Sequence, residues 1–300
     1  MAKEAKVKVN MASRNQSTGG KIFDFCNYLL LTILGLLMLA PLLYVLVGSF
    51  SSTGLATSKG FGSFSLDAYV MIFRGGKTLN GLINSGIITI CGTVMNIVIT
   101  SITAYALSKK DLPGRKIFMW FVMFFMLFTA GLIPDYITVA NKYGLLDTYW
   151  AIWLPVLISS SNLIIMKSFF QQLPESIEES ARIDGCNDIQ SFIRIVLPMS
   201  KASIATFSLF YAVGHWNNYL RPMIYLNNEN MWPITVWLRQ LIILSSGTVG
   251  DDVVTEAVVW APSNTVKYAT IIVSTVPIIC VYPFLQKHFT KGVLLGSVKG

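Results

Sequence analysis

Six apolar stretches alternate with polar segments along the chain. A helix needs roughly 20 apolar residues to cross a bilayer core of about 30 Å, and each stretch is near or above that length. We therefore expect an all-α membrane protein with six transmembrane helices. Their expected ranges are 25–50, 82–107, 117–134, 149–170, 202–226 and 268–289.

The composition also indicates a membrane protein. Of the 300 residues, 53% are hydrophobic and only 13% are charged, and the mean hydropathy is +0.59. Soluble domains carry about 25% charged residues. The first apolar run is too long for the core of a secretory signal peptide, and no clear cleavage site closes it. We expect it to stay in the protein as a helix.

Lysine and arginine predict the orientation in the membrane. They are roughly twice as frequent in the segments that share a side with the two termini as in the opposite segments, which places both termini in the cytoplasm. The net charge of +8 needs no nucleic acid as a partner. A basic tail and cytoplasmic loops beside anionic lipid account for it.

The six helices form one expected domain with polar extensions. We expect cytoplasmic tails at 1–22 and 291–300, and a transmembrane domain at 23–290 that includes a cytoplasmic loop at 173–198 and a long extracytoplasmic loop at 227–266. Residues 64–69 favour a short interfacial helix. Because six helices are few for enclosing the path of a large polar solute, we expect a second subunit to complete the path.

The sequence contains no pattern typical of catalysis. Its four cysteines and two histidines form no metal-ligand cluster. No glycine-rich loop is present to cradle phosphates, so this chain is expected to bind no nucleotide and no other cofactor. No grouping of nucleophile, histidine and carboxylate indicates an active site. We expect a protein that is not an enzyme and whose energy comes from elsewhere.

The loop at 173–198 carries signals for two short helices joined by a turn. Ser176 and Glu179 have the spacing of a capping box, and Gly185 can take the left-handed conformation that ends a helix. Asn187 or Asp188 can cap a second helix, which is expected to end before Pro198. Taken alone, these signals also fit an ordinary amphipathic cytoplasmic loop.

The spacing within this loop resembles the EAA motif in permease subunits of bacterial ABC importers. Three further segments resemble the maltose-type carbohydrate permeases, so that the likeness covers most of the chain. The matching positions of the motif are Glu179, Ala181, Gly185, Ile195, Leu197 and Pro198. The further segments are 173–174, 215–219 and 291–300. Ser180 stands where the motif most often has alanine, and Asn218 where the family commonly has an acidic residue.

The resemblance implies a type I ABC importer permease in the plasma membrane of a bacterium. Such a subunit pairs with a second, related permease, sits on two ATPase subunits that bind ATP and Mg²⁺, and receives sugar from an extracytoplasmic binding protein. The long segment at 227–266 is typical of the subgroup for longer or acidic oligosaccharides. The residues implied in ATPase coupling are Glu179, Ser180, Ala181, Asp184, Gly185, Ile195, Leu197 and Pro198. Lys291, Gly292 and Lys299 are implied in a tail that contacts the ATPases.

Polar and aromatic residues within the spans are candidates for lining the substrate path. Polar side chains in a membrane are costly unless they face water or another helix. The main candidates are Asn162, Trp216, Asn217, Asn218 and Tyr219, with Asn84, Asn96 and residues 159–161 as further ones. The alternative is that the polar residues hold helices together and the aromatic ones are interfacial anchors.

Two other functions remain open from the sequence. An importer permease for a non-sugar solute would share the EAA motif. An ion-coupled carrier would require broken helices and an ionisable pair at mid-membrane, and neither is evident from the sequence.

Overall fold

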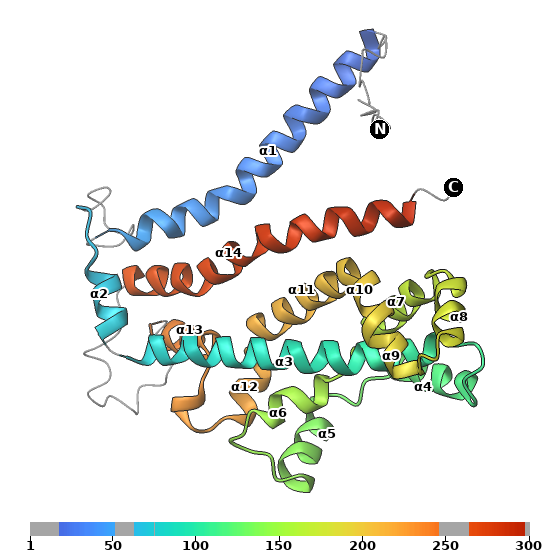
Figure 1. The fold of residues 1–300 in the computed structure, drawn as a ribbon. Helices are drawn as coiled ribbons and strands as arrows, with labels where there is room; N and C mark the ends of the chain where they lie inside the picture. The colour runs from blue at the N-terminus through green and yellow to red at the C-terminus, as the bar shows by residue number, and fades with distance from the viewer. Residues whose placement is uncertain (1–17, 52–62, 75, 246–263, 298–300) are drawn as a thin grey trace.

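The computed structural model describes residues 18–51, 63–74, 76–245 and 264–297 (Figure 1). Regular structure in these ranges is helical, apart from an isolated bridge between Ser51 and Phe64. The predicted all-α class is therefore confirmed.

The first half of the chain contains two long helices and several short ones. Their bounds are α1 (Thr18–Ser49), α2 (Asp67–Arg74), α3 (Lys77–Ser108), α4 (Arg115–Leu127), α5 (Leu132–Ile137), the π-helix η1 (Thr138–Lys142), α6 (Trp150–Trp153) and the 3₁₀-helix η2 (Leu154–Val156).

The second half contains more short helices and ends in a long one. Their bounds are α7 (Ser160–Gln171), α8 (Glu175–Ile183), α9 (Asp188–Ser191), the π-helix η3 (Phe192–Val196), α10 (Leu197–Met199), α11 (Lys201–Asn217), α12 (Leu220–Tyr225), the 3₁₀-helix η4 (Glu229–Met231), α13 (Ile234–Ser245) and α14 (Asn264–Ser297).

Three of the described helices, α1, α3 and part of α14, are long and apolar enough to cross a membrane, and three bent pairs of helices bring the candidates to six. The stretch expected at 117–134 breaks after Leu127, and its two parts are bent by 115°. The stretch expected at 149–170 breaks between Val156 and Ser160, with a bend of 54°. The stretch expected at 202–226 is interrupted at Asn218 and Tyr219. The apolar composition did not predict these breaks, because hydropathy measures transfer into lipid and not the direction of the backbone.

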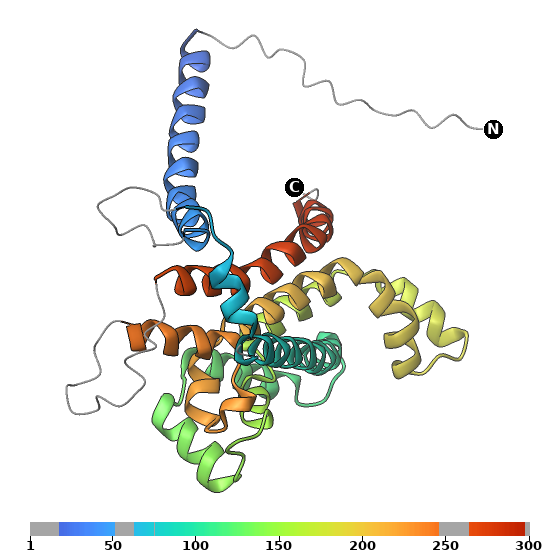
Figure 2. The same cartoon turned by 90° about the vertical axis from the view of Figure 1, so that its left-hand side faces the viewer.

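α3 is the central helix, and it buries its polar side. Seen from its Lys77 end, α3 lies among α11, α12 and α13, whereas α1 stands apart (Figure 2). Apart from Ile88, small or polar side chains recur on the buried side at intervals of four residues, which lets neighbouring helices approach closely. The series is Asn84, Ile88, Gly92, Asn96, Thr100 and Ala104.

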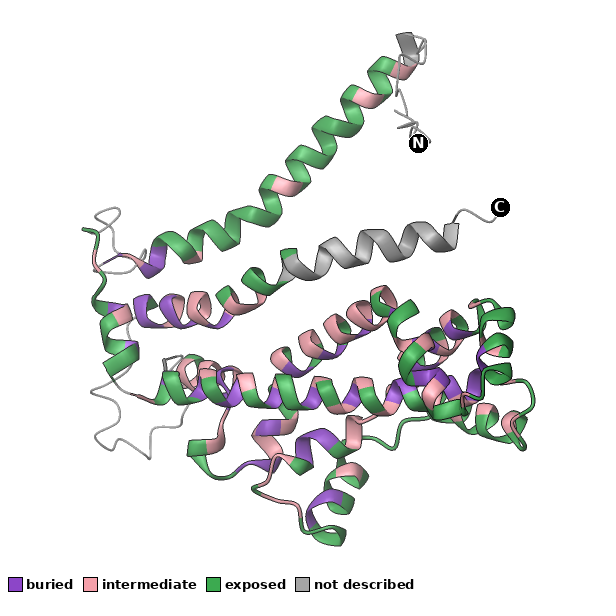
Figure 3. Ribbon diagram, in the orientation of Figure 1, coloured by how far each residue is buried: buried purple, intermediate pink, exposed green. Residues whose placement is uncertain are grey.

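α1 extends away from the other helices and is exposed along nearly all of its length (Figure 3). It contacts α14 near its C-terminal end, where the rings of Tyr44 and Tyr268 lie 5.9 Å apart. The helix begins at Thr18, so its first residues fall within the tail expected at 1–22. Residues 1–17 lie outside the described ranges.

Two segments that connect the expected spans contain helices, one of them predicted and one not. The helix predicted near residues 64–69 is α2, and its Ala68 and Ile72 pack against Val266 and Ala269 of α14. The expected loop at 227–266 includes α13, which packs against α3, so this part is not a solvated loop. Its buried residues Ile234 and Val236 provide the physical reason. Residues 246–263 lie outside the described ranges.

Candidate coupling surface and transport cavity

The helix α8 ends in the turn that Gly185 predicted. Gly185 has a φ of +84°, its amide donates to the Arg182 carbonyl at 3.0 Å, and the Cys186 amide donates to the Ala181 carbonyl at 2.9 Å. This pair of hydrogen bonds is a Schellman motif. The expected cap at the other end was wrong, since α8 starts after Pro174 and Ser176 lies inside it. Pro174 is the N-cap residue, and no side chain caps this end of the helix.

A second short helix follows and continues into the membrane bundle. Asn187 caps it in a reciprocal capping box: the Gln190 amide donates to Asn187 Oδ1 at 2.8 Å and the Asn187 amide donates to Gln190 Oε1 at 3.1 Å. The helical path does not end before Pro198 as expected. Pro198 lies in the first turn of α10, where a missing amide hydrogen is tolerated, and the path then bends by 82° into α11.

Two lysines that follow α3 hold α8 in place. Lys109 forms an ion pair with Glu178, and both side chains are only 20% exposed. Lys110 lies 2.6 Å from Glu175 in a pair that is 75% and 72% exposed. Burial lowers the pKa of Lys109, with a smaller contribution from Arg182. The hydrogen bond from Lys110 lowers the pKa of Glu175.

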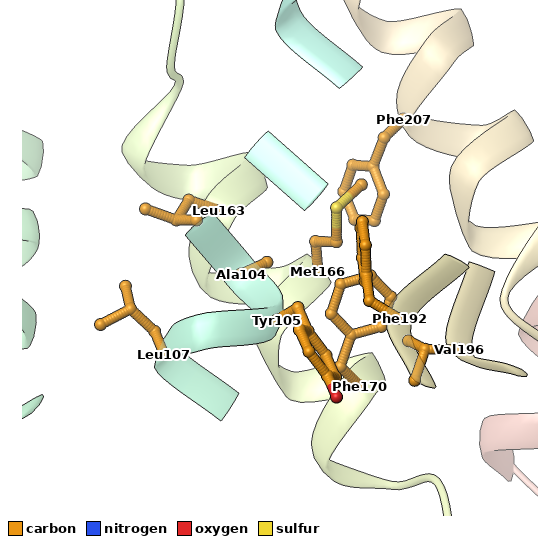
Figure 4. Close-up of a cluster of buried hydrophobic side chains, with 9 residues drawn as sticks. All are labelled: Ala104, Tyr105, Leu107, Leu163, Met166, Phe170, Phe192, Val196 and Phe207. Carbon is orange, nitrogen blue, oxygen red and sulfur yellow. The ribbon is translucent and has the colours of Figure 1, made fainter. Parts of the chain in front are cut away.

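A buried hydrophobic cluster joins this loop to the transmembrane helices (Figure 4). The rings of Tyr105 and Phe192 lie 5.0 Å apart, and Phe170 meets Tyr105 edge-on at 6.5 Å. The cluster therefore connects α3, α7, η3 and α11 in one packed unit. Its members are Ala104, Tyr105, Leu107, Leu163, Met166, Phe170, Phe192, Val196 and Phe207.

The outer side of the loop exposes apolar side chains among charged ones. Ile183 is 85% exposed and Ile189 is 70% exposed. By contrast, Ala181 on the same loop is buried. Exposed isoleucines outside the hydrocarbon region favour a surface that another protein covers.

A cavity of about 1240 Å³ lies between α3, α4, α5, α7 and α12. Its wall is largely apolar, with phenylalanines from α4 and the segment after it, Phe118, Phe121, Phe125 and Phe128. Thr103, Ser160, Ser161 and Asn218 add polar groups.

The cavity wall includes one pair of opposite charges. Arg221 Nη1 on α12 lies 2.9 Å from Asp135 Oδ2 on α5, and Tyr225 donates a hydrogen bond to the same oxygen at 3.2 Å. Asp135 and Arg221 are the only charged residues lining it in the described part of the chain. No metal-binding group of histidine, cysteine or carboxylates occurs in that part either.

Comparison with known families identifies the class of protein. Residues 97–295 match the family described as "Binding-protein-dependent transport system inner membrane component". The chain belongs to this family of ABC transporter permeases. It is therefore a transport subunit of the inner membrane and not an enzyme. Membership excludes the ion-coupled carrier that the sequence left open.

Individual relatives agree with this family over nearly their whole lengths. The polygalacturonan/rhamnogalacturonan transport system permease protein YtcP of Bacillus subtilis is 47% identical over 93% of this chain and 99% of its own. Protein LplC of the same organism is 45% identical over 95% of this chain and 98% of its own. A solved bacterial ABC transporter involved in the import of the acidic polysaccharide alginate has a chain with a TM-score of 0.82 and 31% identity. That match covers 91% of this chain and 98% of the other. The fold is thus that of a type I ABC permease.

The permease buries two of the candidate path residues as contacts between helices. Asn84 donates to the carbonyls of Asn230 and Trp232 at 2.7 and 3.1 Å and accepts from Tyr149 at 3.0 Å. Asn96 is saturated in the same way, by the carbonyls of Val156 and Leu157 and by the His215 ring. Both residues follow the alternative that the sequence left open, in which polar residues hold helices together, because a buried amide is stable where backbone carbonyls need donors.

The main path candidates separate in the structure. Asn218 lines the cavity, and the half-buried Asn162 follows its lining residues Ser160 and Ser161 on α7. Trp216 instead donates to the Ser274 carbonyl on α14 at 3.1 Å and lines an apolar groove there. Asn217 and Tyr219 are exposed, and the Arg239 guanidinium lies 5.4 Å from the Tyr219 ring centre.

The remaining coupling candidates lie on the loop surface or beneath it. Glu179, Ser180, Asp184 and Pro198 are exposed, Ile195 is half-buried, and Leu197 packs against the cluster of Figure 4.

Most of the expected ATPase-contacting tail at 291–300 is part of α14. The helix continues to Ser297, so position 291 is no helix boundary. Lys291 and Gly292 lie in this last part of the helix, and Lys299 lies outside the described residues.

The pair of Asp135 and Arg221 was not predicted from the sequence. Asp135 directly follows the expected span at 117–134, and Arg221 lies within the expected span at 202–226. The signal was present, since an arginine within the expected 202–226 span needs a partner or water.

Proposed function

We propose that this chain is one transmembrane subunit of a saccharide importer and that α8 couples it to ATP hydrolysis. Two ATPase subunits, which bind ATP and Mg²⁺, each offer a cleft, and α8 enters the cleft facing this chain. A second, related permease completes the path as a heterodimer, and an extracytoplasmic binding protein delivers the solute. One observation carries the proposal: α8 exposes an acidic and apolar outer face while its base is fixed to the bundle.

The packing supports a mechanical form of coupling. α9, η3 and α10 run into α11, and the cluster around Tyr105 and Phe192 packs them against α3 and α7. Since close-packed cores transmit displacement rather than absorb it, movement of α8 would turn the bundle between inward-facing and outward-facing states.

The membrane topology in this proposal has six spans: α1, α3, the bent pair of α4 with α5 and η1, the bent pair of α6 and η2 with α7, α11 with α12, and α14. Both termini lie in the cytoplasm, on the side of α8. The excess of lysine and arginine in the loops on that side supports this orientation. Lys291, Gly292 and Lys299 would then extend toward the ATPases.

The solute in this proposal is an acidic oligosaccharide. Two observations support it: the saccharides in the names of the relatives, polygalacturonan and alginate, carry a carboxylate on their uronate rings, and the cavity contains an arginine. A cavity of about 1240 Å³ also exceeds the roughly 300–1,000 Å³ of an ordinary small-molecule pocket.

Site-directed crosslinking tests the coupling. Cysteine placed at Ser180, which is exposed on α8, should crosslink to an ATPase subunit in the assembled transporter, and a cysteine at the exposed Ser168 of α7 should not. Gly185→Pro should abolish uptake while the protein still inserts into the membrane, because proline cannot adopt a φ of +84°. Normal uptake by Gly185→Pro would refute the coupling role.

A further inference from the structure

We propose that Arg221 binds a carboxylate of the saccharide inside the cavity, and that Asp135 is the temporary counter-ion which this carboxylate replaces. The inference rests on the proposed function and adds the residue that recognises the acidic group. It starts from the placement of one arginine and one aspartate, from α12 and α5, on the wall of the same cavity.

The Nη1 atom of Arg221 is paired in charge but not in hydrogen bonding. This atom lies 2.9 Å from Asp135 Oδ2 and is buried, yet it donates no hydrogen bond to any described residue. A buried donor without an acceptor is costly, and arginine's planar fork matches the two oxygens of a carboxylate. A uronate carboxylate entering the cavity would supply the missing acceptor.

Asp135 can release Arg221 without becoming unpartnered. The hydroxyl of Tyr225 donates to Asp135 Oδ2 at 3.2 Å, and Tyr225 itself is fully buried and stacked on Tyr136 at 5.7 Å. The carboxylate of Asp135 therefore keeps one hydrogen bond when the guanidinium turns to a ligand. Exchange of one carboxylate for another also leaves the total number of ion pairs unchanged, so the sugar can leave again.

The rest of the wall fits the remainder of a sugar. Rings of Phe121 and Phe125 offer apolar faces to sugar C–H groups, while Ser160, Ser161 and Asn218 offer hydrogen-bonding partners for hydroxyls. A neutral saccharide could use these groups as well. Only Arg221 among the described lining residues would distinguish an acidic saccharide from a neutral one.

The competing explanation is that the pair only holds α5 against α12. These two explanations predict different results when both charges are removed. If the pair is structural, loss of either partner harms the protein alike, and the double neutral variant is better than the single ones. If Arg221 binds the ligand, loss of Arg221 harms the uptake of acidic ligands far more than that of neutral ones, and the double variant takes up the acid no better.

The test measures uptake by the complete transporter in proteoliposomes with its binding protein. The probes are an oligogalacturonate and its fully methyl-esterified counterpart, presented at equal length. Arg221→Gln should reduce uptake of the acid by about tenfold or more, since hydrogen bonds to charged groups are of that strength, and should reduce uptake of the ester far less. Asp135→Asn should keep or increase uptake of the acid, and Arg221→Gln with Asp135→Asn should transport the acid as poorly as Arg221→Gln alone.

Two results would overturn the inference. One is wild-type uptake of the acid by Arg221→Gln, and the other is an equal loss for acid and ester that the double variant reverses. If Arg221→Gln fails to assemble, Asp135→Asn decides the matter, because a fall in uptake of both probes with this variant contradicts a ligand-binding arginine. If the wild-type transporter imports the ester and not the acid, the proposed acidic substrate is wrong. That failure is separate from a failure of Arg221.

Discussion

The Nε2 atom of His215 on α11 lies 2.6 Å from the Oδ1 atom of Asn96 on α3. Asn96 uses its Nδ2 group to donate to the carbonyls of Val156 and Leu157, at 2.6 and 2.8 Å. Because the Oδ1 atom can only accept, His215 must carry a proton on Nε2. Val156 and Leu157 lie where the span containing α6 and α7 is broken, so Asn96 supplies donors that the helix lacks there.

Asn96→Leu should destabilise the protein, because it removes the donors to the carbonyls of the half-buried Val156 and Leu157 and leaves the buried His215 ring without this partner. The expected loss is at least about 2 kcal/mol, since each unsatisfied buried group costs about 1–3 kcal/mol. Thermal unfolding of the purified protein in mild detergent measures the effect. The control is Thr103→Val, because Thr103 bonds only within its own helix, to the Ile99 carbonyl at 2.8 Å. Equal melting temperatures for the two variants would contradict the assigned role of Asn96.

Gly92→Ala should be much more harmful than Gly86→Ala on the same helix. A Cβ atom at Gly92 would lie 2.6 to 2.9 Å from three atoms of the His215 ring, whereas a Cβ at Gly86 meets nothing within 4 Å. Overpacking of this kind costs about 1–3 kcal/mol. At Gly86, alanine should be neutral or stabilising by about 0.5–1 kcal/mol, because glycine weakens a helix. The same melting experiment ranks the two variants, and a reversed order would refute the close contact.

Glu178→Gln should loosen α8 more than Glu175→Gln does. Glu178 and its partner Lys109 are largely shielded from water, whereas Glu175 and Lys110 are exposed. Removing one partner of a shielded pair leaves a poorly solvated charge, and we expect a cost of about 1–3 kcal/mol, compared with about 0–1 kcal/mol for an exposed pair. Limited proteolysis of the loop at 173–198 measures the loosening. If both variants are cleaved at the same rate, the shielded pair of Glu178 and Lys109 stabilises α8 no more than the exposed pair does.

Asp147 should make the segment around Asn228 sensitive to acid. Its Oδ1 atom accepts from the amides of Asn228 and Asn227 at 2.8 and 2.5 Å, and these bonds lower the pKa of Asp147 below its usual 3.8. The sign follows from the lowered pKa: the stabilisation is complete above about pH 4 and is lost as the pH falls through the folded-state pKa.

Hydrogen exchange of the segment around Asn228, compared at pH 7 and pH 3, tests the sensitivity. After correction for the intrinsic rates, protection in the wild type should fall at the lower pH. Asp147→Asn is the matched control. Asparagine tolerates the left-handed φ of 55° at this position, and its side-chain oxygen still accepts hydrogen bonds, but it does not titrate. An equal change in wild type and variant would assign the acid effect to other groups.

Local signals in the sequence were sufficient for the coupling loop. Gly185 ended α8 and Asn187 capped α9 as predicted, because the groups that satisfy a helix end lie within a few residues of it. Length and apolar composition likewise predicted the helical class, since a chain in lipid must satisfy its backbone internally. The cap predicted at Ser176 was a local prediction too, but it was wrong. The N-cap residue of α8 is Pro174, two positions earlier.

Contacts between distant positions were decided only by the tertiary structure. Asn96 and His215 are 119 positions apart, and Asp135 and Tyr225 are 90 apart. The sequence showed that these polar side chains need partners in a membrane, but it did not show which ones they have. The sequence around a polar residue in a span looks the same whether its side chain faces a cavity or another helix. The difference lies in the relative placement of α3, α5, α11 and α12, which follows from packing of the whole bundle and not from any single segment.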